Sequence, residues 1–176
     1  YSKQRSFLLN DLNQFKHSEV EYSLTKKVNL SPFATIFSIF IKDLFNYRFN
    51  NDEKIALGDY LNSYQDQHTG LFVEPKCNNP DFYCKKCLQL TTFSMSALSI
   101  LGLEQKYKIN HNMKTKEQIF AFLDKVGVKD GKLGSGNFAM FLGIFLSYDK
   151  ILNPNNELIN FWFDYHNEYY NRNNGF

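Results

Sequence analysis

The chain has 176 residues, which is enough for one domain with a sizeable apolar core. Its formal net charge is only +2 and its basic residues are dispersed, whereas a nucleic-acid groove needs a concentrated basic face. The apolar run from Ser31 to Ile41 is too short to cross a bilayer. We therefore expect a cytoplasmic protein that neither spans a membrane nor binds nucleic acid.

The first part of the chain, residues 1–30, is predicted to hold one extra N-terminal helix followed by a linker. The helix is expected over about 3–15, because its apolar residues return to one side with helical spacing. Those residues are Phe7, Leu8, Leu12 and Phe15.

A hairpin of two helices is predicted over 31–72. Ser31 suits the N-cap of the first helix, and Pro32 suits its first helical position. The second helix, 52–65, begins with acidic residues, which favour the positive end of a helix. The apolar positions of the first helix are Phe33, Ile36, Phe37, Phe40, Ile41 and Leu44.

The stretch 73–90 is interpreted as an insertion, and it contains all three cysteines of the chain. Cys77, Cys84 and Cys87 follow the pattern C-x6-C-x2-C, and His68 lies nine residues before the first of them. A C-x2-C pair has suitable spacing for two ligands of a tetrahedral zinc ion, and His68 is the candidate fourth ligand. A disulfide and unliganded thiols remain alternatives, because a single C-x2-C pair is a modest signal.

Two further hairpins are predicted over 91–134 and 135–176, so the expected fold class is all-α. No segment shows the alternation of apolar and polar residues that is typical of a strand. The helices expected in these two units are 91–102, 115–126, 137–149 and 156–170.

The last unit repeats the first at a constant offset of 105 positions. Eleven of the forty-one pairs between 31–71 and 136–176 are identical, and a weaker copy lies between them. Repeats of this length indicate a modular helical architecture. The last copy stops at Phe176, within the repeated motif, which we interpret as a piece of a longer array. Examples of identical pairs are Phe33 with Phe138, Ile39 with Ile144, Tyr60 with Tyr165 and Gly70 with Gly175.

The run from Tyr60 to Phe72 resembles the QW repeat of the squalene cyclase and protein prenyltransferase superfamily. The residues that carry this resemblance are Tyr60, Leu61, Gln65, Gly70, Leu71 and Phe72. The resemblance implies stacked hairpins that form part of an α/α toroid, in which inner helices line a cavity. It also implies that Gln65 and Phe72 join neighbouring hairpins and have no catalytic role.

The same resemblance implies a cavity that holds a lipophilic chain. Its wall would include inner-helix residues, although such residues are also typical of an ordinary core. Neither the zinc-ligand pattern of the prenyltransferases nor the acidic motif of the cyclases occurs, so whether the chain is an enzyme stays open. The alternatives are a non-catalytic helical-repeat binding module and a carbohydrate-active toroid of bacterial polysaccharide metabolism. The candidate wall residues are Phe37, Phe40, Phe93, Met95, Phe141 and Phe145.

Overall fold

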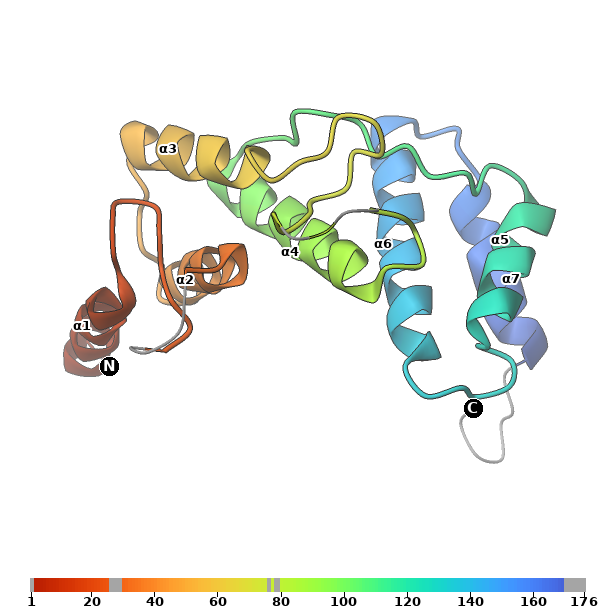
Figure 1. Ribbon diagram of the computed structural model, residues 1–176, viewed down its shortest axis with the longest axis horizontal. Helices are drawn as coiled ribbons and strands as arrows, with labels where there is room; N and C mark the ends of the chain where they lie inside the picture. The colour runs from red at the N-terminus through yellow and green to blue at the C-terminus, as the bar shows by residue number, and fades with distance from the viewer. Residues whose placement is uncertain (1, 26–29, 76, 78–79, 170–176) are drawn as a thin grey trace.

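The computed structural model describes residues 2–25, 30–75, 77 and 80–169. Every regular element within these ranges is a helix, and a few isolated bridges form no sheet, which confirms the all-α class (Figure 1). The elements are α1 (Ser2–Leu12), a short 3-10 helix (Asn13–Phe15), α2 (Pro32–Leu44), α3 (Asn51–Asn62), α4 (Lys85–Leu101), α5 (Lys116–Val126), α6 (Ser135–Leu152) and α7 (Leu158–Tyr169).

The helix ends follow the local capping chemistry. Asn50 accepts a hydrogen bond from the Glu53 N–H, and the Glu53 carboxylate accepts one from the Asn50 N–H, so this pair forms a capping box at the start of α3. Thr115 caps α5 through the Gln118 N–H. Gly102 ends α4 in the left-handed conformation, at the residue expected from the sequence.

The largest difference from the expected boundaries is at the start of α4. The helix begins at Lys85, six residues before the expected 91, so it includes part of the predicted insertion. The reason is a cap that sequence patterns do not anticipate: the Cys84 sulfur accepts a hydrogen bond from the Cys87 N–H. The segment between α3 and α4 therefore ends at Cys84.

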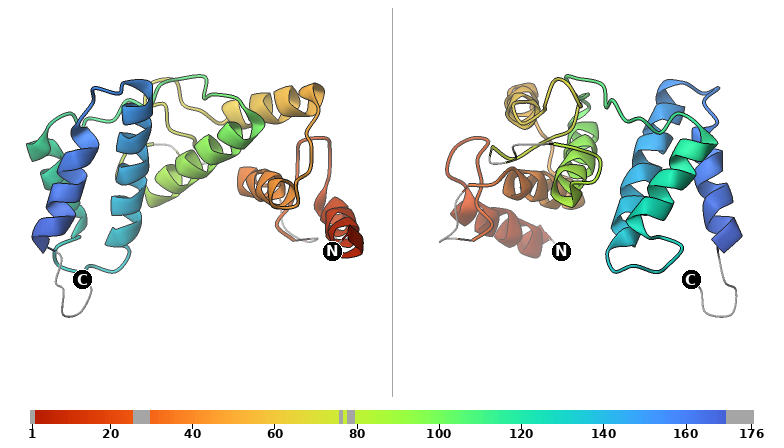
Figure 2. Two further views of the ribbon diagram at one scale, coloured as in Figure 1. Left: turned by 180° about the vertical axis from the view of Figure 1, so that it is seen from behind. Right: turned by 45° about the vertical axis from the view of Figure 1, so that its right-hand side comes forward.

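Helices α2, α4 and α6 lie side by side in a row, and α3, α5 and α7 pack on the helices of this row. Helix α4 packs between α2 and α6, α3 packs on α4, and α5 and α7 pack on α6 and on each other (Figures 1 and 2). Each of α4 and α6 thus contacts both helices of the unit before it. The described part of the chain forms an open arch, with α1 and α2 at one end and α5 and α7 at the other.

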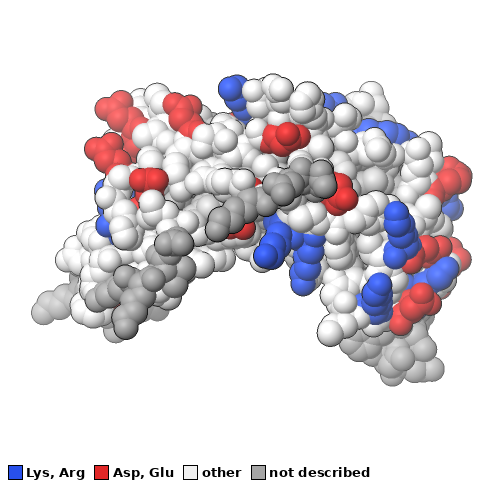
Figure 3. Space-filling model, viewed as in Figure 1, with Lys and Arg blue, Asp and Glu red and all other residues white. Residues whose placement is uncertain are grey.

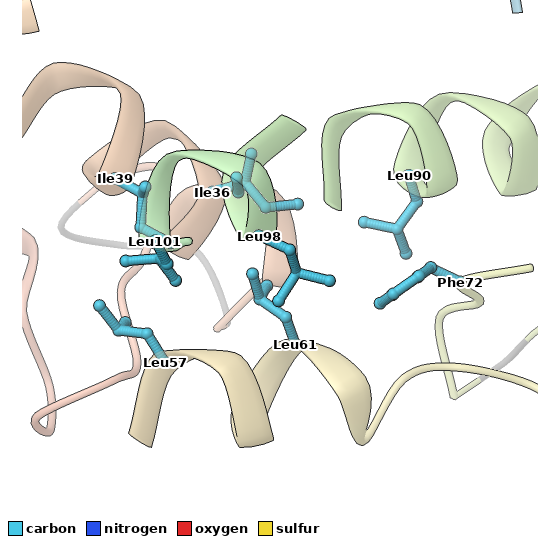
Figure 4. Packing of buried hydrophobic residues seen from close by; sticks show 9 residues of the cluster. Ile36, Ile39, Leu57, Leu61, Phe72, Leu90, Leu98 and Leu101 are labelled. Atoms are coloured by element: carbon cyan, nitrogen blue, oxygen red, sulfur yellow. The ribbon is translucent and has the colours of Figure 1, made fainter. Parts of the chain in front are cut away.

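Three apolar clusters stabilise the arch. The first joins α2, α3 and α4, where Leu98 and Leu101 of α4 lie near Ile39 of α2 and Leu57 of α3 (Figure 4). The second joins α5, α6 and α7. The third connects these two, because it contains residues of both α4 and α6 together with the loop that precedes α4. The members of this connecting cluster are Leu71, Cys87, Leu88, Met95, Ile109, Phe141 and Phe145.

The surface has no dominant sign of charge on the face shown in Figure 3. Acidic side chains gather over the α3 end of the arch, and basic and acidic side chains mix over the α5 and α7 end. In the part of the chain that the structure describes, no helix has both the length and the apolar character needed to cross a membrane.

Candidate metal centre and apolar groove

The three cysteines converge at the start of α4. Cys84 is the N-cap of this helix, and Cys87 lies in its first turn, so the backbone holds both sulfurs on one side. Cys77 reaches them from the preceding loop, where a turn is closed by its N–H donating to the Glu74 carbonyl at 2.9 Å. The sequence spacing predicts the nearness of Cys84 and Cys87, and the fold adds Cys77.

The sulfur atoms are close enough to share one ion. All three Sγ atoms lie within 4.8 Å of one another. The Cys84–Cys87 distance is 2.8 Å and the Cys77–Cys87 distance is 3.3 Å. Tetrahedral Zn–S bonds of about 2.3 Å would place two sulfurs roughly 3.8 Å apart. The cluster would therefore need to expand only slightly around a zinc ion.

The surroundings of the cluster are apolar. Cys87 is buried, and Cys77 and Cys84 are half-buried against the connecting cluster. Burial, followed by hydrogen bonds with the two other thiols, raises the pKa of Cys87 above its ordinary value. A thiol in this setting stays protonated unless a cation compensates the thiolate charge, and a bound metal ion supplies that compensation.

His68 does not join the cysteines. Its side chain is exposed, its ring Nε2 lies 3.4 Å from the Gln67 amide nitrogen, and the group of converging ligands contains only the three cysteines among the described residues. The loop geometry accounts for this position. Asp66 accepts hydrogen bonds from the N–H groups of His68 and Thr69, which turns this part of the chain into a local Asx-type loop.

The six candidate wall residues separate into two groups. Phe37, Phe40 and Phe93 touch one another edge to face on α2 and α4, with ring centroids 5.9–6.3 Å apart. Phe141 and Phe145 are fully buried in the connecting cluster, where Met95 accompanies them. The six side chains therefore lie in two separate groups.

A different surface forms an open groove of about 1590 Å³ along α6. Helix α4 makes one wall and α7 the other, and the lining is mostly apolar. Of the six candidate wall residues, only Met95 lines this groove, and none of the cysteines does. The principal apolar lining residues are Met95, Ile100, Met140, Ile144, Ile151, Ile159, Trp162 and Phe163.

Sequence reasoning missed most of the groove, although one signal for it is present. Met140, Ile144 and Ile151 follow helical spacing on α6, on a different side from the buried Phe141 and Phe145. A helix that is apolar on two sides needs two partners. Only one of these sides is buried, since Met140 is 46% exposed and Ile151 is 73% exposed.

The loop that resembles a QW repeat joins two parts of the chain. The Gln65 amide nitrogen donates to the carbonyls of Gly70 at 2.8 Å and Tyr107 at 2.6 Å, and its amide oxygen accepts from the Tyr107 N–H at 2.7 Å. Phe72 is fully buried, and its N–H donates to the Thr91 hydroxyl. These contacts agree with a structural role for Gln65 and Phe72.

A buried imidazole lies between α6 and the segment before α5. His111 Nε2 is 2.9 Å from an Asp149 carboxylate oxygen and 3.3 Å from Lys114 Nζ, and His111 Nδ1 is buried without a hydrogen-bond partner among the described residues. Burial, reinforced by the charge of Lys114, lowers the pKa of His111 from its ordinary value of 6.5, and Asp149 opposes this shift. Asp149 lies 38 residues after His111 in the sequence, so no motif marks this contact.

We expect acidification to destabilise the fold through His111. Because its pKa is lower in the folded state than in the unfolded state, protonation favours unfolding, and the loss begins as the pH falls below 6.5. Urea unfolding of the metal-free protein at about pH 7.5 and about pH 5.5 measures this effect. His111→Gln should lose less stability between the two pH values than the parent protein does. The exposed His68 provides the control: His68→Gln should keep the parent difference, and an unchanged difference in His111→Gln would contradict the assignment.

No protein-family model, curated protein or solved structure matches this chain. The geometry of the cysteine cluster and of the groove therefore carries the functional argument.

Proposed function

We propose that this chain is a non-catalytic helical-repeat binding module that is stabilised by a structural zinc ion. The convergence of three thiol sulfurs within 4.8 Å carries the proposal. Thiolates are ligands that zinc prefers, and these three sulfurs would fill three of the four positions of a tetrahedral structural site. Cys77, Cys84 and Cys87 would hold the ion.

The location of the cluster supports a structural role for the ion. Catalytic zinc needs an open coordination position that faces a substrate site. The three sulfurs instead pack among Leu71, Leu88 and Phe145, and none of them lines the groove along α6. An ion at this point would fasten the loop before α4 to the helix, which is what a loop without its own core requires.

We expect the purified protein to bind about one zinc ion per chain. At a free zinc concentration of about 100 times the dissociation constant, binding should raise the free energy of unfolding by about 2.7 kcal/mol. Zinc titration followed by thermal unfolding measures the gain, and a thiol reagent measures protection of the cysteines.

Cys87→Ser should lose both the gain in stability and the protection. His68→Ala is the matched control, because its imidazole lies outside the cluster and its removal should leave zinc binding unchanged. Loss of binding in His68→Ala would identify it as the fourth ligand and require a rearranged loop. Parent protein that gains no stability from zinc, with three freely reactive thiols, would contradict the metal site.

A further inference from the structure

The helices of the central row, α2, α4 and α6, are the inner helices, and α4 and α6 pack in the same way. Helix α4 lies against both helices of the unit before it, α2 and α3, and α6 likewise lies against α4 and α5. Each of the first two units therefore presents a notch between its two helices, and the next inner helix occupies that notch. If the same packing continued, a further helix would lie against α6 and α7.

The groove lies at the position that this packing specifies. Its floor is α6 and one of its walls is α7. Ile144 and Trp162 are half-buried there, and Phe163 is 54% exposed. In the described ranges these apolar side chains line an open groove, whereas the corresponding notches of the first two units are filled by α4 and α6.

The internal repeat relates three of the four buried α2 and α3 residues of the first notch to the groove, whereas the equivalent of Ile36 is Phe141 in the connecting cluster. Ile39, Leu57 and Leu61 pack in one cluster with Leu98 and Leu101 of α4 (Figure 4). At the offset of 105 positions, the equivalents of these three residues are, in order, Ile144, Trp162 and His166. All three line the groove.

Gly58 marks a difference between the first notch and the groove. A Cβ atom at Gly58 would lie 2.4 Å from the Leu103 side chain, just after the end of α4, and 3.9 Å from Leu98, so this glycine leaves room for Leu103 against α3. The equivalent residue at the same offset is Phe163, which lines the groove. The repeat thus replaces a small residue by a large apolar one, so a helix in the groove would contact the Phe163 ring here and would not approach the α7 backbone as Leu103 approaches α3.

We propose that the groove binds an amphipathic α-helix of a polypeptide partner, in the position that α4 takes against α2 and α3. The partner helix would carry an apolar face with the spacing of Ala97, Leu98 and Leu101 on α4. Its length would be comparable to that of α4, which has 17 residues and packs along α6, a helix of 18 residues. Helix-in-groove binding of this kind uses apolar anchors at positions i, i+3, i+4 and i+7.

A peptide with the sequence of residues 85–101 and the substitution Cys87→Ser is the probe. Trp162 is the single tryptophan of the chain and lines the groove, and the peptide contains no tryptophan. The peptide should shift Trp162 emission to shorter wavelengths and saturate. A fluorescent label on the peptide gives an independent anisotropy measurement of the same affinity.

Two variants of the protein test the location. Met140→Asp and Phe163→Asp should each weaken binding about tenfold or more in the anisotropy measurement. Both side chains are substantially exposed, so the variants should fold, which circular dichroism checks. Ile55→Asp is the matched control, because Ile55 is 56% exposed on α3 and lies outside the groove.

Three outcomes would overturn the proposal. The first is a peptide titration that does not saturate. The second is equal binding of a peptide that carries both Leu98→Asp and Leu101→Asp, because binding would then not depend on its apolar face. The third is saturable, Phe163-dependent binding of a fifteen-carbon isoprenoid alcohol without binding of the peptide, which would assign the groove to a small lipophilic ligand.

Discussion

Replacing Gly70 by alanine should destabilise the protein by about 3–5 kcal/mol. Gly70 has a φ angle of +72°, and a Cβ atom there would lie 2.2 Å from the Lys108 carbonyl oxygen and 2.8 Å from the Ile109 Cα atom. Both neighbours are backbone atoms, so they cannot rotate away as a side chain can. The segment that contains Lys108 and Ile109 would have to move, which would also disturb the contacts of Tyr107 with Gln65.

Gly102→Ala provides a closely matched control for this experiment. Gly102 has almost the same φ angle, +73°, but a Cβ atom there would meet no atom of the described residues within 4 Å. Its substitution should therefore cost only the strain of a left-handed alanine, about 1–2 kcal/mol. Urea unfolding of the two variants measures the difference. Equal losses would show that the close approach at Gly70 does not contribute to stability.

Replacing Gln65 by alanine should destabilise the protein by about 2–4 kcal/mol. The side chain is only 8% exposed and makes hydrogen bonds to three backbone groups of Gly70 and Tyr107. Removing it leaves these groups without their partner, and a buried polar group that loses its partner costs more than an average hydrogen bond contributes.

Gln67→Ala tests whether this loss is specific. Gln67 belongs to the same loop, but it is exposed, and its amide nitrogen lies 3.4 Å from the His68 ring Nε2. Its substitution should change the free energy of unfolding by no more than about 0.5 kcal/mol. Both variants can be compared by urea unfolding, and a loss for Gln65→Ala as small as that for Gln67→Ala would contradict the role of the amide.

Much of the fold could be predicted because the relevant signals are local. Helical spacing of apolar residues marked α2, and glycine at the C-cap marked the end of α4 at Gly102. The start of α4 could not be predicted from helix propensity, since it depends on a sulfur cap at Cys84. The pairing of helices could not be read from these local signals, because α2 and α3 each pack on α4, whereas α5 packs on α6 and α7.

The sites were less predictable, because they depend on which side of a helix meets which neighbour. Cys84 and Cys87 are close through one helical turn, but the position of Cys77 depends on a loop, and His68 is held elsewhere by Asp66. The phenylalanines of the inner helices have similar spacing. Packing nevertheless buries Phe145 and leaves Phe37 38% exposed, and neither lines the groove.

The connecting cluster has a consequence for how the molecule unfolds. It lies between the two larger apolar clusters and contains one of the three cysteines, while the other two pack against it. Helices that contact only their neighbours can lose their structure one group at a time, unless the contacts between the groups are strong. An ion bound at Cys87 would strengthen the contacts at the junction. Metal content would then set the cooperativity of unfolding, with one transition for the zinc-bound chain and two separable transitions for the metal-free chain.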